Sequence, residues 1–320
     1  MVNLRRFEQD ILRDDVSEDE VDEYPVAKVG KMWAQYGHQY TPCEHATPGL
    51  PAGMYTTRAN DDGKIWFVQQ TVETDTLQTP IHEQACMEVL DTVTQFVDMK
   101  DLYAQHGFMW KRGVLMYGPP GSGKTSLLRL IAQRAIEMQN AVIIFATVPH
   151  WDAKSIRQMR LIEPDRLIVV VFEDIDAIIE HYGEEEILSI LDGEQMVDNI
   201  LFVATTNYPE KLDERLTHRP SRFDVVTLIN NPGYESRLDY LNTKLVDIYE
   251  TEVIEKMARD TDDLSMADIK ELMVSILCYK YEIDATVKRL KDARSAKYNS
   301  DEYKRVSSSI GFTSSVKSAK

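Results

Sequence analysis

The most informative stretch of this chain is Gly118-Pro119-Pro120-Gly121-Ser122-Gly123-Lys124-Thr125. It fits the pattern G-x-x-x-x-G-K-[ST], in which glycines let successive backbone N–H groups point at phosphate oxygens. The apolar run Val114–Tyr117 before it suits a buried parallel strand, and residues 126–139 after it carry apolar side chains on one helical face. A strand, this loop and a helix N-terminus together form an anion site. The chain is therefore expected to bind a nucleoside triphosphate.

The residues of this loop have separate expected roles. Lys124 should reach the β- and γ-phosphates, and the hydroxyl of Thr125 should take a place on Mg²⁺. We therefore expect the cofactors ATP and Mg²⁺. The expected nucleotide-binding residues are the loop and the helical residue after it: Gly118, Pro119, Pro120, Gly121, Ser122, Gly123, Lys124, Thr125 and Ser126.

Composition limits the class of protein. The 320 residues suffice for one large or two modest domains. The net charge of −17 disfavours direct binding to nucleic acid or to an anionic membrane. No apolar run approaches the roughly 20 residues of a membrane helix, and three scattered cysteines suit a reducing compartment. We therefore expect a cytoplasmic protein without a membrane segment.

Five apolar runs alternate with helical patterns between residues 80 and 230. This alternation predicts an α/β fold, a three-layer large domain with a five-stranded parallel sheet. A long helix from residue 80 to about residue 106 should precede it. The expected strands are Val114–Tyr117, Ala141–Phe145, Leu167–Phe172, Ile200–Ala204 and Val225–Ile229.

The flanking regions differ in composition from this domain. Residues 1–24 should form an acidic arm, since nine Asp/Glu lie between residues 8 and 23. Residues 25–79 should form a separate accessory region with a β-hairpin around residues 60–63. Residues 231–285 should form a small helical lid, in which Ser265-x-x-Asp268 resembles a capping box. Residues 286–320 should be a terminal helix and a basic, flexible tail.

Three carboxylates end the third expected strand. Glu173, Asp174 and Asp176 follow residues 167–172 directly, and ligands of open α/β sheets bind at the carboxyl ends of the strands. Such a cluster is costly without a cation or polar partner. For Asp176 alone, capping of the next helix is an equally good interpretation.

These motifs resemble the AAA ATPase family over roughly residues 80–275. Residues 118–125 match its Walker A motif, residues 167–176 its Walker B strand, residues 204–207 its sensor 1, and residues 219–224 its arginine-finger region. The resemblance implies an AAA+ fold and a Mg-dependent ATP phosphohydrolase. Residues 103–113, 187–193 and 206–213 are similar to one branch in particular. That branch contains the mitochondrial AAA ATPase that assembles the cytochrome bc complex, with stand-alone relatives in bacteria and phages.

The resemblance also implies roles for single residues. Glu173 would support Mg²⁺ together with Thr125, Asp174 would polarise the attacking water, and Asn207 would orient that water. The order Glu173-Asp174 replaces the more common Asp-Glu, as in the branch just named. Because Asp is one methylene shorter than Glu, hydrolysis could be slow.

Two arginines are expected to act between subunits. By resemblance, Arg219 and Arg222 would face the nucleotide of a neighbour in a homo-oligomeric ring of six or seven subunits. If one of them only braces its own loop, we expect it to be Arg219, against Asp213 or Asp224.

Two aromatic residues are candidates for gripping a polypeptide in the pore of such a ring. Trp151 lies in the expected loop 148–151, and Tyr182 in the next pore-facing region is the weaker candidate. An aromatic side chain near a strand end equally suits packing.

The leading prediction is a ring-forming AAA ATPase that couples ATP hydrolysis to remodelling, translocation or disassembly of a protein substrate. One alternative is an ATPase directed at nucleic acid, such as a helicase or clamp loader, which only the basic tail favours. Another is a slow, nucleotide-gated assembly switch, which the Glu173-Asp174 order keeps open.

Overall fold

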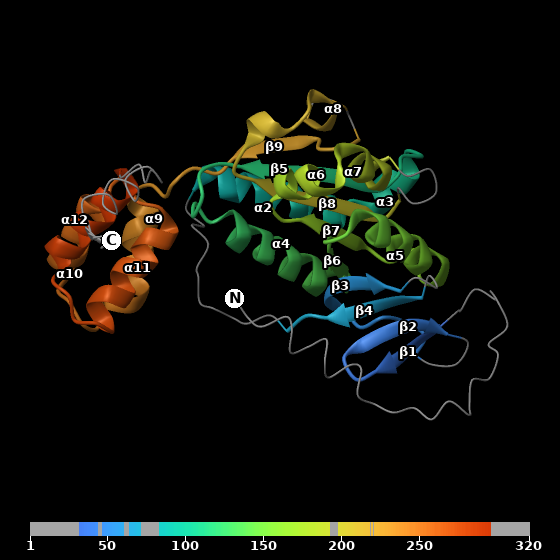
Figure 1. Ribbon diagram of the computed structural model, residues 1–320, viewed down its shortest axis with the longest axis horizontal. Coiled ribbons are helices and arrows are strands. Elements are labelled where there is room, and N and C mark those ends of the chain that lie inside the picture. The colour runs from blue at the N-terminus through green and yellow to red at the C-terminus, as the bar shows by residue number, and fades with distance from the viewer. Residues whose placement is uncertain are drawn as a thin grey trace, which may run out of the picture.

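The computed structural model describes residues 32–43, 47–60, 64–71, 83–192, 198–217, 219 and 221–295. These residues form one sheet flanked by helices and, beside it, a bundle of helices (Figure 1). The expected acidic arm and basic tail lie outside the described residues.

The five predicted strands are parallel neighbours and extend to one edge of the sheet, as expected for an α/β fold. They are β5 (Lys111–Tyr117), β6 (Val142–Phe145), β7 (Ile168–Phe172), β8 (Ile200–Thr206) and β9 (Val225–Leu228), in the order β6-β7-β8-β5-β9. Every residue of β7 and β8 is buried. Continuous apolar runs of this kind form central strands because helices cover both faces of a parallel sheet.

Helices cover the two faces of the central sheet (Figure 1). One face packs against α2 (Gln84–Asp98) and α4 (Lys124–Gln139). The other packs against α5 (Pro149–Ile162), α6 (Ile175–Tyr182) and α7 (Glu184–Leu191). The single helix expected up to residue 106 is divided, since α2 ends at Asp98 and α3 (Lys100–Gln105) follows. The short helices η1 (Pro209–Lys211) and α8 (Glu214–Thr217) lie between β8 and β9.

The N-terminal strands are part of the same sheet, so the expectation of a separate accessory piece is wrong. β3 (Gly53–Ala59) pairs parallel with β6 and antiparallel with β4 (Ile65–Gln69). β2 (Gln39–Cys43) and β1 (Met32–Tyr36) follow, which gives nine strands among the described residues, in the order β1-β2-β4-β3-β6-β7-β8-β5-β9. In a five-stranded sheet, β6 would be an open edge, and β3 instead satisfies its backbone groups.

In the part of the chain that the structure describes, four helices form the lid. They are α9 (Tyr234–Leu245), α10 (Thr251–Asp260), α11 (Met266–Leu277) and α12 (Ile283–Ser295). The capping box predicted at Ser265 is present, with Asp268 as its partner. The last helix was expected outside the lid, yet Val287 and Leu290 of α12 are buried in the same apolar cluster as α9 to α11.

Hydrogen bonds between described residues connect the lid to the large domain. Glu83, just before α2, accepts hydrogen bonds from the N–H of Gly233 (2.5 Å) and the hydroxyl of Ser236 (2.8 Å) at the start of α9. The N–H of Ala267 in α11 donates to the carbonyl of Gly121 at 3.4 Å. The lid therefore touches the phosphate-loop motif directly. Among the described residues, no helix combines the length and apolarity that crossing a bilayer requires.

Candidate nucleotide site

The glycine-rich loop joins β5 to α4 through backbone that only glycine adopts easily. Gly118 has φ of +152°, and a Cβ there would lie 2.1 Å from the carbonyl oxygen of Ile229. Gly123 has φ of +106° and is the N-cap of α4. Both positions favour glycine because left-handed backbone is strained for other residues. The loop thereby presents the N-terminus of α4, with its unpaired N–H groups, to any anion within it.

Lys124 lies inside this loop. Its ammonium donates to the carbonyls of Gly118 and Pro119, both at 2.9 Å, and to the hydroxyl of Ser122 at 3.4 Å. Burial lowers the pKa of Lys124, and the nearby charge of Asp174 opposes that shift. Carbonyl oxygens do not neutralise an ammonium, so this cation would gain from a phosphate in the loop.

The carboxylates after β7 meet residues from two other elements. The hydroxyl of Thr125 in α4 donates to Glu173 at 2.7 Å, and the amide of Asn207 after β8 donates to Asp174 at 3.2 Å. The N–H of Asp174 also donates to the hydroxyl of Thr205 at 3.1 Å. The backbone of Asp174 is in the left-handed region (φ +48°), so the chain turns sharply between β7 and α6. The structure thus brings together five predicted residues, namely Lys124, Thr125, Glu173, Asp174 and Asn207.

This arrangement fits a magnesium ion. Mg²⁺ binds hard oxygen ligands, keeps several waters, and needs only one or two protein groups beside the phosphates. The hydroxyl of Thr125 and the carboxylate of Glu173 are adjacent oxygen ligands of that kind. Burial raises the pKa of Asp174, and the charges of Glu173 and Asp176 add to this shift while Lys124 opposes it. A cation at the site would relieve the repulsion between these carboxylates.

Asp176 has a structural partner on the neighbouring strand. Its carboxylate is buried and accepts from the hydroxyl of Thr206 at 2.6 Å. The same hydroxyl accepts from the N–H of Tyr208 at 2.9 Å. Thr206 directly precedes Asn207, so this pair fixes the chain on both sides of the expected water-orienting residue. Asp176 joins the first turn of α6 to the end of β8, a role that sequence reasoning missed.

The two arginines differ in a way opposite to the expected one. Arg222 is 3% exposed and forms a two-pronged ion pair with Asp192, and it also donates to the carbonyl of Arg215. Arg219 has a 66% exposed side chain and lies 3.8 Å from the same carboxylate. Arg222 is therefore the bracing residue in this structure, and neither Asp213 nor Asp224 is its ion-pair partner. The hydrogen bonds from Arg222 also hold the pKa of Asp192 below its usual range.

The two pore candidates lie on helices. Trp151 is in the first turn of α5, since Pro149 already begins the helix; it is not in a loop as expected. Proline suits that first position because its missing N–H has no helical partner there. Trp151 is partly buried, whereas Tyr182 at the end of α6 is 38% exposed. Their place in a pore remains a prediction.

Sequence reasoning missed two other contacts of the site. Asp192 lies in the stretch 187–193, which carried part of the family resemblance, but no charge pattern in the sequence pointed to its pairing with Arg222. Ser265 and Ala267 of the lid approach Gly121 in the loop, and a Cβ on Gly121 would lie 2.8 Å from the hydroxyl of Ser265. The capping box was visible in the sequence, but its position beside the loop was not.

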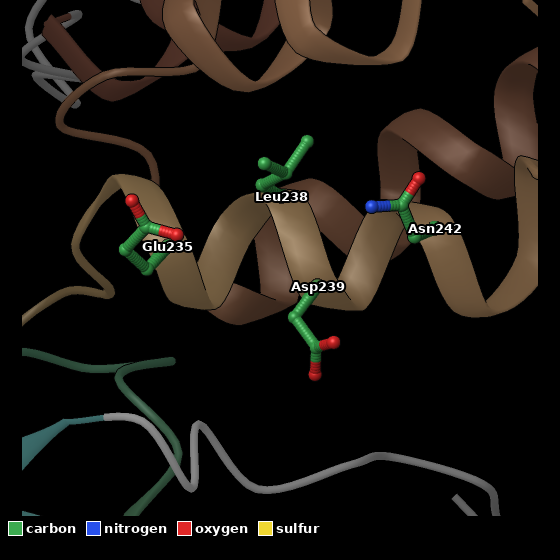
Figure 2. Close-up of a pocket in the computed structure, with 4 residues that line it drawn as sticks. All are labelled: Glu235, Leu238, Asp239 and Asn242. Carbon is green, nitrogen blue, oxygen red and sulfur yellow. The ribbon is translucent and has the colours of Figure 1, made fainter. Parts of the chain in front are cut away.

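A shallow pocket of about 180 Å³ lies elsewhere, on α9 of the lid. Figure 2 shows the carboxylates of Glu235 and Asp239 projecting from this helix beside Leu238 and Asn242. Among the residues that the structure describes, two acidic side chains and no basic one line this pocket, so it does not suit a phosphate. The phosphate-binding groups remain those at the loop.

The loop, its lysine and the strand-end carboxylates define a P-loop nucleotide site on an open α/β sheet. Comparison with known families agrees, since residues 114–231 match the model of the "ATPase family associated with various cellular activities (AAA)". This part of the chain is therefore an AAA ATPase domain.

Known relatives are similar over a wider range. Proteasome-activating nucleotidase 1 of Halobacterium salinarum is 29% identical over 67% of this chain and 57% of its own length. Proteasome-activating nucleotidase 2 of Haloferax volcanii is 30% identical over 59% of this chain and 50% of its own length. The ATP-dependent zinc metalloprotease FtsH of Magnetococcus marinus is 28% identical over 66% of this chain and 34% of its own length. The chain thus spans about half the length of the two nucleotidases and a third of the metalloprotease.

Proposed function

We propose that this protein is a Mg²⁺-dependent ATPase that forms a ring and uses hydrolysis to remodel, translocate or disassemble a polypeptide. One observation carries the proposal. Thr125 contacts Glu173 and Asn207 contacts Asp174, so groups from α4, β7 and β8 converge beside the buried cation of Lys124. This is the set that phosphoryl transfer requires: a cation at the phosphates, metal ligands and a group for the water.

Each group has a role that its position supports. Lys124 binds the β- and γ-phosphates, and Thr125 with Glu173 would hold Mg²⁺, which supplies positive charge to the phosphate oxygens when bound. Asp174 orients the attacking water and accepts its proton, and its raised pKa favours that role over one as a bare counter-ion. Asn207, held by Thr206 and Asp176, fixes the position of Asp174 through the 3.2 Å hydrogen bond.

The ring is supported by the exposed guanidinium of Arg219. A permanently charged, planar donor on the surface can reach the nucleotide of a neighbouring subunit and stabilise charge that develops during transfer. Arg222, paired with Asp192, would hold the segment that carries Arg219. We propose a homo-oligomer of six or seven subunits on this basis.

A polypeptide substrate is supported by the relatives and by charge. Two of the relatives are named for activating proteasomes and another is named a metalloprotease. The net charge of −17 disfavours nucleic acid. We further propose membership of the branch that resembles the mitochondrial cytochrome bc assembly ATPase, and a cytoplasmic location, from the sequence motifs and composition alone.

An ATPase assay with three additions tests this function. The full chain would be assayed alone, with casein as an unstructured polypeptide, and with single- or double-stranded DNA, with Asp174→Asn as the inactive control. We expect stimulation by casein. Stimulation by DNA instead would indicate a nucleic-acid-directed ATPase, and a slow rate unaffected by either would indicate a nucleotide-gated switch. Particle imaging with a slowly hydrolysed ATP analogue would count the subunits.

A further inference from the structure

A buried carboxylate at the start of α5 has no role in the nucleotide site. Asp152 is fully buried. Its carboxylate oxygens accept hydrogen bonds from the hydroxyl of Thr57 and from the N–H groups of Thr147 and Val148. Burial raises the pKa of Asp152 to about 6, although all three hydrogen bonds oppose that shift. Within the described part of the chain, no lysine or arginine forms an ion pair with this carboxylate. A buried carboxyl group is costly unless it is hydrogen-bonded, so the folded protein needs these three hydrogen bonds.

One oxygen of this carboxylate fixes the turn that leads into Trp151. Oδ2 accepts from the N–H groups of Thr147 and Val148, each at 2.9 Å. These are the last two residues before α5, and Trp151 follows within its first turn. The indole ring of Trp151 lies 4.6 Å from the ammonium of Lys154 and 5.0 Å from the ring of His150. Trp151 therefore directly follows the turn whose backbone N–H groups Asp152 holds.

The other oxygen connects this turn to the N-terminal strands. Oδ1 accepts from the hydroxyl of Thr57, which is in β3. At the far end of α5, Glu163 accepts from the indole N–H of Trp33 and the N–H of Leu50, each at 2.8 Å. Apolar side chains of α5 and of β1 to β4 also share one core cluster. Helix α5 is thus anchored at both ends in the part of the sheet that precedes the phosphate loop.

We propose that Thr57 and Asp152 are a positioning pair through which the N-terminal strands set the orientation of Trp151. A partner or movement at β1 to β4 would then change how the first turn of α5 meets a polypeptide. The functional half of this inference rests on the proposed polypeptide-remodelling activity. The structural half, the dependence of Trp151 on Thr57, does not.

The test replaces the hydroxyl without changing the shape of the side chain. Thr57→Val removes the donor to Asp152, and Thr57→Ser retains it. Thr56→Val is the matched control, since the partner of the neighbouring Thr56 hydroxyl among the described residues is the exposed side chain of Gln70, from which it accepts a hydrogen bond. Each full-length variant would carry 5-fluorotryptophan at its four tryptophans. The ¹⁹F resonance of Trp151 is assigned with Trp151→Phe, and that of Trp110, in the core on the other face of the sheet, is the internal reference.

We expect Thr57→Val to shift or broaden the Trp151 resonance while that of Trp110 stays in place. The basal ATPase rate should be unchanged, because Thr57 is outside the nucleotide site. The casein concentration for half-maximal stimulation should rise about tenfold, the effect of one lost hydrogen bond to a buried charge. Thr57→Ser and Thr56→Val should both resemble the wild type.

Two results separate the failure of this inference from the failure of the proposed function. An unchanged Trp151 resonance in Thr57→Val overturns the positioning pair, whatever casein does. A changed resonance in a protein that casein does not stimulate supports the pair and removes the polypeptide activity. If the Trp110 resonance also moves in Thr57→Val while the Thr57→Ser protein is normal, the substitution has unfolded the protein generally. That result would count against a local positioning role.

Discussion

Thr206→Val tests whether the hydroxyl between Asp176 and Tyr208 holds the end of β8 in place. Valine matches threonine in shape, so the substitution removes the donor to Asp176 and the acceptor for the N–H of Tyr208 without opening a cavity. Thr206 is fully buried and Asp176 is 7% exposed, so water cannot replace the lost partner of the carboxylate. A hydrogen bond to a charged group contributes ~1.5–3 kcal/mol, and leaving that group unpaired costs a similar amount.

The expected loss of stability is therefore about 2–3 kcal/mol, which corresponds to a fall of roughly 5–10 °C in the midpoint of thermal unfolding. Because Thr206 directly precedes Asn207, kcat should also fall while ATP affinity, which depends on the phosphate loop, stays constant. Calorimetry and a coupled ATPase assay measure these effects. The matched control is Thr94→Val, because the Thr94 hydroxyl donates to the carbonyl of Leu90 in its own helix and to no other group of the described residues. Equal midpoints for Thr206→Val and the wild type would refute the reasoning.

Four further substitutions test the site and the buried acid. Lys124→Ala should weaken ATP binding substantially, since it removes the buried cation of the loop; unchanged affinity in titration calorimetry would contradict the assignment. Asp174→Asn should bind Mg-ATP and lose turnover, whereas Glu173→Gln should lose Mg²⁺-dependent binding; the opposite pattern would reverse the two roles. Asp152→Asn tests a pH dependence. The native pKa of Asp152 is about 6 against an ordinary 3.8, so the native state holds the proton more tightly and the wild type loses stability as pH rises between about 4 and 6. Between pH 4 and pH 7, the free energy of unfolding of the variant, measured in urea, should therefore rise relative to that of the wild type by up to ~3 kcal/mol. A difference in unfolding free energy that does not change with pH would contradict this.

The central sheet and the nucleotide loop were predictable because their signals are local. A glycine loop between an apolar strand and a helix has few other interpretations, and β7 and β8 read as continuous apolar runs because both of their faces are buried. The chemistry at Glu173, Asp174 and Asn207 followed from a general rule, that strand ends meet at one edge of a parallel sheet.

Contacts between distant segments were not predictable from the sequence. Nothing in the pattern of β3 shows that it pairs with β6, since strand pairing depends on which edge is left open. The ion pair of Arg222 with Asp192 joins residues 30 positions apart and depends on how α7 ends. Because this ion pair was not foreseen, the sequence analysis named Arg219 as the bracing residue, whereas the structure has Arg222 in that place.

The most direct test of a shared site between subunits mixes two inactive variants. Lys124→Ala subunits lack nucleotide but keep Arg219, and Arg219→Ala subunits keep nucleotide but lack the guanidinium. Each alone should lose activity, the arginine variant by about 10³–10⁵. In rings assembled from an equal mixture, half of the subunits hold nucleotide and half of their neighbours supply the arginine, so about one quarter of the boundaries should be active. A mixture no more active than its components, or a monomer that hydrolyses ATP normally, would contradict the ring.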